Sequence, residues 1–180
     1  CMNAGGILTN WSCYDLDYIL GLCGWQFQPR RILAQTWPCI PDFRCHIAPE
    51  SDAEAHFAAL VVGEDGSVLS IERGEFMPMA SETAWQIIGT KGALRLAMVS
   101  SEARTMVLDT ASEAAGVVSE TVWEGADDGP CANQLAIEDF AAAVRAGGKP
   151  ATSLEQALTM MQITDGIYQS AQEGNAVSVA

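Results

Sequence analysis

Short apolar runs separated by glycine-containing turns fill the chain between residues 30 and 124, and this pattern limits what it can fold into. Two such runs flank Gly63-Glu64-Asp65-Gly66, which is typical of a β-hairpin, and two more, over residues 83–89 and 93–98, flank Thr90-Lys91-Gly92. Residues 117–124 alternate between two faces with the period of two that is typical of a strand. We therefore expect a mostly antiparallel meander of strands from Arg30 to Glu124, beginning with a strand from Arg30 to Trp37.

The period becomes helical on both sides of this meander. Before it, Ser12 is a suitable N-cap, Asp15 follows at the spacing of a capping box, and Gly24 fits the residue after a helix end. After it, an apolar stripe predicts a helix over residues 137–144, and Thr152-Ser153-Leu154-Glu155 predicts the capping box of a longer helix. One helix is therefore expected before the strands and two after them.

These elements predict an α+β fold, in which one large, predominantly antiparallel, open β-sheet carries helices packed on one face. We expect a single domain over residues 1–180, with a first helical region over 1–25, the sheet over 30–124, and closing helices with a short last strand over 131–180. The other face of such a sheet needs a cover. Since only 18% of the residues are charged, we expect further copies of the chain to provide it, as a homodimer or tetramer.

Acidic residues outnumber basic ones, and the formal net charge is −14. Nucleic acids and anionic membrane surfaces are bound by clusters of Lys and Arg, so neither is expected as a partner. No apolar run reaches the roughly 18 residues that a membrane-spanning helix needs. The sequence also opens without the basic and apolar regions of a secretory signal.

The cysteines and histidines show no metal-site or disulfide-framework spacing. The six cysteines are Cys1, Cys13, Cys23, Cys39, Cys45 and Cys131. We interpret them as reduced thiols of a cytoplasmic protein. His46 and His56 are separated by Pro49 and an expected loop, and we interpret them as surface and strand residues rather than as a metal pair.

Polar side chains gather near the start of the first helix, opposite its apolar stripe. At about 100° per residue, Tyr14 points away from Leu16 and Leu20, with Asp17 on its flank. On residue type alone, such a tyrosine packs its ring and exposes its hydroxyl, which favours a structural role over catalysis.

Two further segments bear on where a site lies. The proline-bracketed stretch from Pro38 to Asp52 exceeds the usual connection of about 4–6 residues, so it is a candidate wall of a site. The charges at Glu72-Arg73-Gly74-Glu75 either line a pocket or form an exposed strand end, and the exposed end is the favoured interpretation.

The first helical region also carries a motif. Gly5-Gly6, Asn10, Ser12, Tyr14 and Asp17 follow the spacing G-G-x-x-x-D-x-G-x-H-x-x-D, which opens the C-terminal domain of the glucose–fructose oxidoreductase, inositol dehydrogenase and rhizopine-catabolism (Gfo/Idh/MocA) family. Residues 51–71, 85–94 and 139–171 are similar to that family's paired strands, its I-x-G-x-x-G-x-L hairpin and its closing helices. The chain therefore resembles that C-terminal domain over nearly its whole length.

The resemblance implies an NAD(P)-dependent oxidoreductase that acts on a sugar, polyol or related hydroxy compound. In the family, an N-terminal Rossmann domain binds NAD or NADP and supplies a lysine, while the motif Asp and His hold a substrate hydroxyl. The resemblance thus implies catalytic roles for Asn10 and Tyr14, and we also expect substrate-binding roles for Asp17 and Trp11. No cofactor or metal site is expected in this chain, which should be inactive without its own Rossmann domain.

The sequence departs from the family motif in ways that leave a second interpretation open. Asn10 and Tyr14 replace the motif Asp and His, and Ser12 replaces the usual glycine. Asn10 cannot ionise, and a tyrosine hydroxyl needs a nearby cation to act as a base near neutral pH. The alternative is a non-catalytic sheet domain that binds a ligand or another protein. Since no element precedes Gly5-Gly6, we expect the chain to be the later part of a longer polypeptide.

Overall fold

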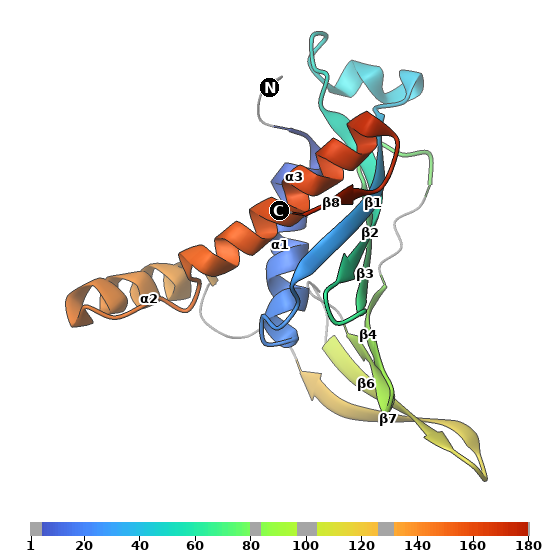
Figure 1. Ribbon diagram of the computed structural model, residues 1–180, viewed down its shortest axis with the longest axis vertical. Helices are drawn as coiled ribbons and strands as arrows, with labels where there is room; N and C mark the ends of the chain where they lie inside the picture. Colours follow the sequence, from blue (N-terminus) through green and yellow to red (C-terminus); the bar gives the residue numbers. More distant parts are fainter. Residues whose placement is uncertain (1–4, 80–83, 97–103, 126–131, 180) are drawn as a thin grey trace. The chain divides into compact units, whose positions relative to one another are not determined.

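The computed structural model describes residues 5–79, 84–96, 104–125 and 132–179 (Figure 1). The chain divides into two compact units, one made of residues 1–79 and 149–180 and the other of residues 80–148. The predicted α+β fold with antiparallel open sheets is confirmed, but the described strands belong to two four-stranded sheets rather than to one. The assignment of the whole chain to a single domain stays a prediction.

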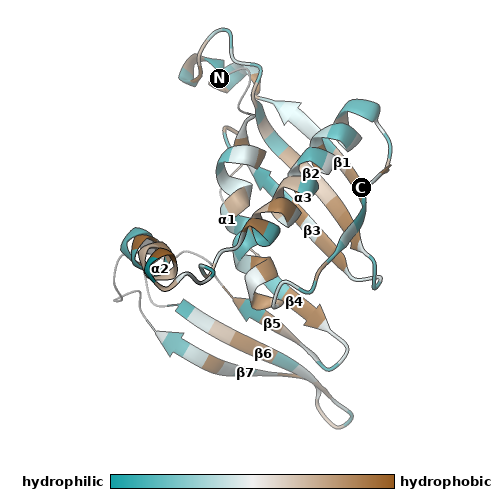
Figure 2. Cartoon of the chain, turned by 60° about the vertical axis from the view of Figure 1, so that its left-hand side comes forward, coloured by the Kyte–Doolittle hydropathy of each residue, from teal (hydrophilic) through white to brown (hydrophobic). Residues whose placement is uncertain are grey.

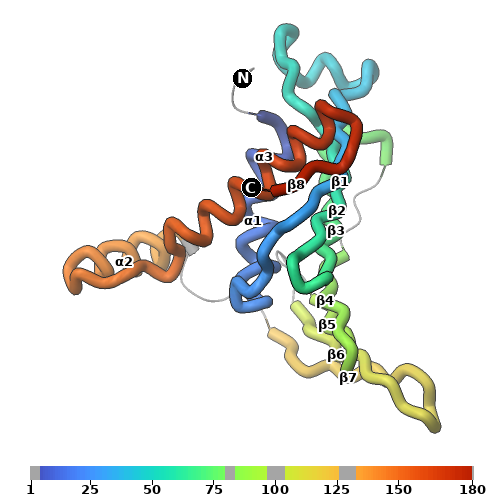
Figure 3. Tube along the Cα trace, viewed as in Figure 1, coloured from blue at the N-terminus to red at the C-terminus, as the bar shows by residue number. Residues whose placement is uncertain are grey.

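The first unit contains most of the helical residues and one of the sheets. Its elements are α1 (Ile7–Leu22), β1 (Pro29–Pro38), the 3-10 helix η1 (Pro41–His46), β2 (Glu54–Gly63), β3 (Val68–Gly74), α3 (Leu154–Glu173) and β8 (Val177–Ser178). The strands pair antiparallel in the order β3-β2-β1-β8. The trace in Figure 3 follows β1, β2 and β3 as neighbouring strands.

One face of this sheet is buried under α1 and α3. The register places Ile32 opposite Val61, and both side chains are fully buried. Leu16 of α1 and Ile163 of α3 belong to the same core, so the two helices cover the same face (Figure 1). Each such side chain contributes about 1.5–3 kcal/mol when it is removed from water, and this shared core therefore fixes α1 on the sheet.

The opposite face of the same sheet is open and partly apolar. Leu33 lies directly opposite Leu60 in the register, and both are about half exposed, as are Trp37 and Val68. Figure 2 shows the hydropathy of each residue along these strands, for both faces together. The uncovered sheet face expected from the sequence is present in this unit.

Helix α1 begins earlier than predicted, and its cap comes from another part of the chain. Gly6 is the N-cap and makes no side-chain cap. Instead, the Glu54 carboxylate at the start of β2 accepts the backbone N–H of Leu8 at 3.0 Å. A side chain on Gly6 would collide with the Glu54 backbone. The predicted cap at Ser12 is wrong: Ser12 lies fully buried inside the helix.

Helix α3 begins with the type of cap that the sequence predicts, displaced by one residue. Ser153, rather than Thr152, is the N-cap; its Oγ accepts the N–H of Gln156 at 3.3 Å, and Gln156 Oε1 accepts the N–H of Ser153 at 2.6 Å. Near the other end, buried Ser170 Oγ accepts the N–H of Ala34 at 2.9 Å. That bond ties α3 to β1 through a backbone group that the sheet leaves free.

The second unit contains the other antiparallel sheet and one helix. Its elements are β4 (Trp85–Gly89), β5 (Gly92–Leu96), β6 (Arg104–Ser112), β7 (Gly116–Gly125) and α2 (Ala132–Ala146), and its strands follow one another in sequence order. Arg95 and Ser119 both donate to Asp109, which lowers the pKa of that carboxyl to about 2. The apolar stripe of α2 remains exposed at Ile137 and Phe140.

Some sequence expectations fall partly outside the described ranges. The strands predicted over 83–89 and 93–98 each include residues outside the described ranges. Cys1 and Cys131 also lie outside these ranges. The other four cysteines are free thiols among the described residues.

Candidate functional site

Helix α1 presents three of the four predicted site residues on one exposed face. Asn10, Tyr14 and Asp17 are spaced by four and three residues, which places them on the same side of a helix. All three are exposed, whereas Leu8 and Leu16 point into the core.

Trp11 lies on the flank of this face and touches it. Its ring centroid is 6.0 Å from that of Tyr14, with the two planes tilted by 58°. Trp11 is 40% exposed and Tyr14 59% exposed, so both rings remain accessible to a ligand. The structure therefore brings Trp11 and Tyr14 together as an aromatic pair beside Asn10 and Asp17.

Arg73 and Asp15 form an ion pair beneath this aromatic pair that the sequence interpretation missed. Nη1 of Arg73, on β3, donates to Oδ1 and Oδ2 of Asp15 at 2.8 and 3.1 Å, and its guanidinium carbon lies 5.0 Å from the centre of the Trp11 ring. Asp15 is buried, so it does not complete a capping box. The favoured interpretation of the charges at 72–75 as an exposed strand end is wrong for Arg73, which is only partly exposed and turns inward to α1.

Two carboxyl groups on α1 have altered acidity. Burial raises the pKa of Asp15 above its usual value, although the charge and hydrogen bonds of Arg73 oppose this change. Partial loss of solvent around Asp17 also raises the pKa of that carboxyl.

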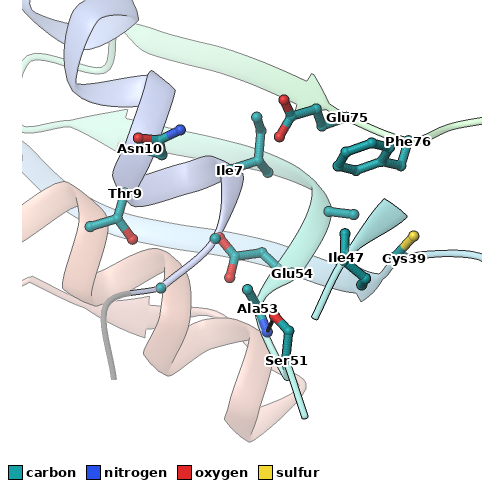
Figure 4. A pocket seen from close by; sticks show the side chains of 13 residues that line it. Ile7, Thr9, Asn10, Cys39, Ile47, Ser51, Ala53, Glu54, Glu75 and Phe76 are labelled. Carbon is teal, nitrogen blue, oxygen red and sulfur yellow. Dashed lines mark hydrogen bonds between the residues drawn. The ribbon is translucent and has the colours of Figure 1, made fainter. Parts of the chain in front are cut away.

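A pocket of about 380 Å³ opens beside the first turn of α1 (Figure 4). Asn10 lines it, together with Glu54 and Glu75; Trp11, Tyr14 and Asp17 do not. The other lining residues are Gly5, Gly6, Ile7, Thr9, Cys39, Ile47, Ser51, Ala53, Ala55 and Phe76. The pocket therefore offers two carboxylates and an amide to a ligand, with no basic side chain among its lining residues.

The long segment between β1 and β2 forms one wall of this pocket, and its part in a functional site stays a prediction. Cys39, Ile47 and Ser51 come from that segment. Arg44 holds it together by donating to the carbonyls of Pro49 and Ser51, both at 2.8 Å.

The two histidines have different partners. His56 pairs with Glu72 at 2.8 Å and stacks on Trp37, whereas His46 stacks on Phe76. Within the part of the chain that the structure describes, no cluster of three or more His, Cys, Asp or Glu side chains is arranged to hold a metal ion.

The sequence and the fold agree with one protein family. The family model for the C-terminal alpha/beta domain of the Gfo/Idh/MocA oxidoreductase family matches residues 2–179. The chain belongs to this family. No curated protein sequence gives a significant match.

Solved structures with the same fold include several oxidoreductases. Aldose-aldose oxidoreductase from Caulobacter crescentus, complexed with glycerol, superposes with a TM-score of 0.73 at 16% identity over 97% of this chain and 48% of its own. Levoglucosan dehydrogenase with NADH and L-sorbose gives 0.71 at 19% identity over 98% and 50%. An oxidoreductase from Agrobacterium radiobacter with NAD+, L-tartaric acid and magnesium gives 0.66 at 16% identity over 98% and 50%.

These likenesses establish the fold, and the chain spans about half the length of the structures that it matches. Among the described residues, no helix is long and apolar enough to cross a membrane.

A dinucleotide does not fit the glycine-led start of this Gfo/Idh/MocA domain's first helix. A pyrophosphate would need the free N–H groups and positive end of a helix. At α1 the Glu54 carboxylate already accepts the N–H of Leu8, and Tyr168 donates its hydroxyl to the same oxygen at 2.9 Å. A second anion at this position would be repelled by the first.

Proposed function

We propose that this chain is the substrate-binding and oligomerisation domain of an NAD(P)-dependent oxidoreductase that acts on a neutral sugar, polyol or related hydroxy compound. The family match carries this proposal, because it covers residues 2–179. The exposed face of α1, with Asn10, Trp11, Tyr14 and Asp17 together, supports it as the place where the substrate lies. The nicotinamide cofactor would be bound by the chain's own Rossmann domain, and it would supply hydride transfer.

Each residue of this face has a role that its chemistry allows. The Asn10 amide both donates and accepts, so it orients a substrate hydroxyl without taking its proton. Asp17 accepts a second hydroxyl, and the Trp11 ring packs against the apolar C–H groups of a sugar. Tyr14 holds the proton that the reacting hydroxyl gives up, with a cation from the Rossmann domain to favour that transfer.

Mutation of Tyr14 in the complete protein that carries this chain tests the proposal. Glycerol, L-sorbose and other neutral sugars and polyols would be assayed with NAD+ and NADP+, following reduction of the nicotinamide. We expect Tyr14→Phe to lower kcat by about 10²-fold or more, because general acid–base catalysis contributes at least that much. The matched control is Tyr18→Phe, one turn along α1, which should keep the wild-type kcat.

Two results would contradict this assignment. If Tyr14→Phe turns over as fast as the wild type, Tyr14 is not catalytic. If the complete wild-type protein reduces neither cofactor with any of these compounds, the non-catalytic interpretation prevails.

Calorimetry tests where the cofactor binds. Titration of the isolated chain with NAD+ should show no binding, because the cofactor is expected to bind the Rossmann domain. Tight binding to the isolated chain would contradict the proposal.

We also propose that the open sheet face mediates a homodimer or tetramer. Leu33, Trp37, Leu60 and Val68 expose apolar surface on one side of the sheet, which a second copy would cover. Leu60→Glu should convert the oligomer to a smaller species in light scattering after gel filtration. Thr90→Glu adds the same charge in an exposed turn and should leave the mass unchanged. A cytoplasmic location stays a prediction from the cysteine pattern.

A further inference from the structure

Arg73 occupies a bridging position between the sheet and the candidate site. It stands on the inner face of β3, opposite Phe57, and reaches α1. One end of its guanidinium is fixed, because Nη1 contacts both oxygens of Asp15 at 2.8 and 3.1 Å. The Asp15 side chain is only 5% exposed, so this anchor is shielded from competing water.

The other side of the same guanidinium lies against Trp11. Its carbon is 5.0 Å from the ring centre, within the range of about 6 Å for an attractive cation–π contact. Trp11 in turn touches the Tyr14 ring at 6.0 Å. The contacts therefore run from buried Asp15 through Arg73 and Trp11 to the exposed Tyr14.

Trp11 contacts both Arg73 and Tyr14. It is 40% exposed, and a half-exposed indole keeps several rotamers unless neighbours restrict it. A planar guanidinium that is itself fixed by a carboxylate can restrict a ring more effectively than a flexible ammonium can.

We propose that Arg73 is a positioning residue that holds the Trp11 ring in the candidate substrate site, with Asp15 as its anchor. The role of Trp11 in substrate binding rests on the function proposed above, whereas the geometric part does not. Arg73 acts through Trp11, and removal of its planar cation frees the ring and disturbs the aromatic pair with Tyr14.

Fluorine NMR of the chain labelled with 5-fluorotryptophan tests the geometric part. Trp11→Phe and Trp37→Phe assign those two resonances. Arg73→Met should shift the Trp11 resonance and leave the Trp37 resonance in place, and Arg73→Lys should shift the Trp11 resonance partway. Glu72→Gln is the matched control, because Glu72 precedes Arg73 on β3 but pairs with His56, which stacks on Trp37. It should therefore affect Trp37 rather than Trp11.

The double variant Asp15→Asn/Arg73→Met guards against loss of the fold, because it leaves no buried carboxylate without its partner. It should show the same Trp11 shift with the other resonances preserved. A Trp11 resonance that is unchanged in both Arg73 variants and in the double variant would overturn the proposal.

Kinetics of the complete protein test the link to the substrate. Arg73→Met should raise KM severalfold with kcat retained, since a binding surface is disturbed but the proton-transfer group remains. A shifted Trp11 resonance together with an unchanged KM would refute the role in the site. If the wild type proves inactive, the function proposed above fails, while the NMR result still decides whether Arg73 positions Trp11.

Discussion

The carboxylate of Glu54 should contribute more to the stability of the first unit than other acidic residues in its neighbourhood. Its Oε1 accepts the N–H of Leu8 at 3.0 Å and the hydroxyl of Tyr168 at 2.9 Å, and it lies at the positive end of α1. A hydrogen bond to a charged group contributes about 1.5–3 kcal/mol, and a carboxylate at a helix N-terminus about 0.3–1 kcal/mol. Both bonds share one oxygen, so we take values at the low end of each range.

On this basis Glu54→Ala should lower the free energy of unfolding by about 3 kcal/mol, from two hydrogen bonds and the helix term. Glu54→Gln keeps an acceptor oxygen but loses the charge, and should lower it by about 1 kcal/mol. Urea unfolding followed by far-UV circular dichroism measures both values, with the slope of the transition unchanged. Glu50→Ala, at an exposed position in the preceding segment, is the control and should stay within about 0.5 kcal/mol.

The same site predicts how stability depends on alkaline pH. Burial raises the pKa of Tyr168 above 10.0, the Thr9 hydrogen bond opposes this, and Glu54 adds to it. A raised pKa means that the folded state holds the proton longer than the unfolded state. The contribution is therefore complete below pH 10 and is lost as the pH rises through the folded pKa. Tyr168→Phe should remove this part of the loss of stability at alkaline pH.

If Glu54→Ala lowers the free energy of unfolding no more than Glu50→Ala does, the cap does not stabilise α1 and the reasoning is wrong.

Four further substitutions and one double variant test the packing around α1. Ser12→Ala should raise the free energy of unfolding by about 1 kcal/mol in urea titrations, because it removes a buried hydroxyl that has no partner among the described groups; a lower midpoint would contradict this. Gly6→Ala should lower it by about 1–3 kcal/mol, since its Cβ would strike the Glu54 backbone, and a neutral effect would show that the backbone yields. Arg73→Met should lower the free energy of unfolding by about 3 kcal/mol, because it leaves the buried Asp15 carboxylate without its partner. Asp15→Asn should cost less, because burial already favours the neutral carboxyl, and the double variant should recover part of the loss; equal costs for the two single variants would refute this asymmetry.

The sequence was a good guide to elements whose signals are local. The strand predicted from Arg30 to Trp37 is observed as Pro29–Pro38, and the alternating stretch 117–124 is observed as Gly116–Gly125. These strands show their period over neighbouring residues. Prolines stand at both ends of the first strand and glycines at both ends of the second. The Gly-Gly motif at the start of α1 was also visible, although its physical reason, the close approach of Glu54, was not.

The errors arose where a distant residue decides the outcome. Ser12 has the chemistry of a cap, but Glu54 supplies the cap 46 residues from Leu8, and no local pattern contains that fact. Asp15 has the spacing of a capping box after Ser12, but its actual partner is Arg73. Arg73 is 58 residues away, so no local pattern shows the pairing. In both cases tertiary contacts overrode a plausible local signal. The face of α1 could be predicted because its residues share one helix, whereas the ion pair beneath it could not.

The cap of α1 also has a consequence for the order in which the unit folds. Its first turn is held by Glu54 from β2 and by Tyr168, whose hydroxyl lies 2.8 Å from the Thr9 hydroxyl although 159 residues separate them. Contacts of such long sequence separation form only after the cost of closing large loops has been met. We therefore expect Glu54 variants to unfold faster while their folding rate changes little. During synthesis, the first turn of α1 can therefore make its contact with Tyr168 only after α3 has left the ribosome.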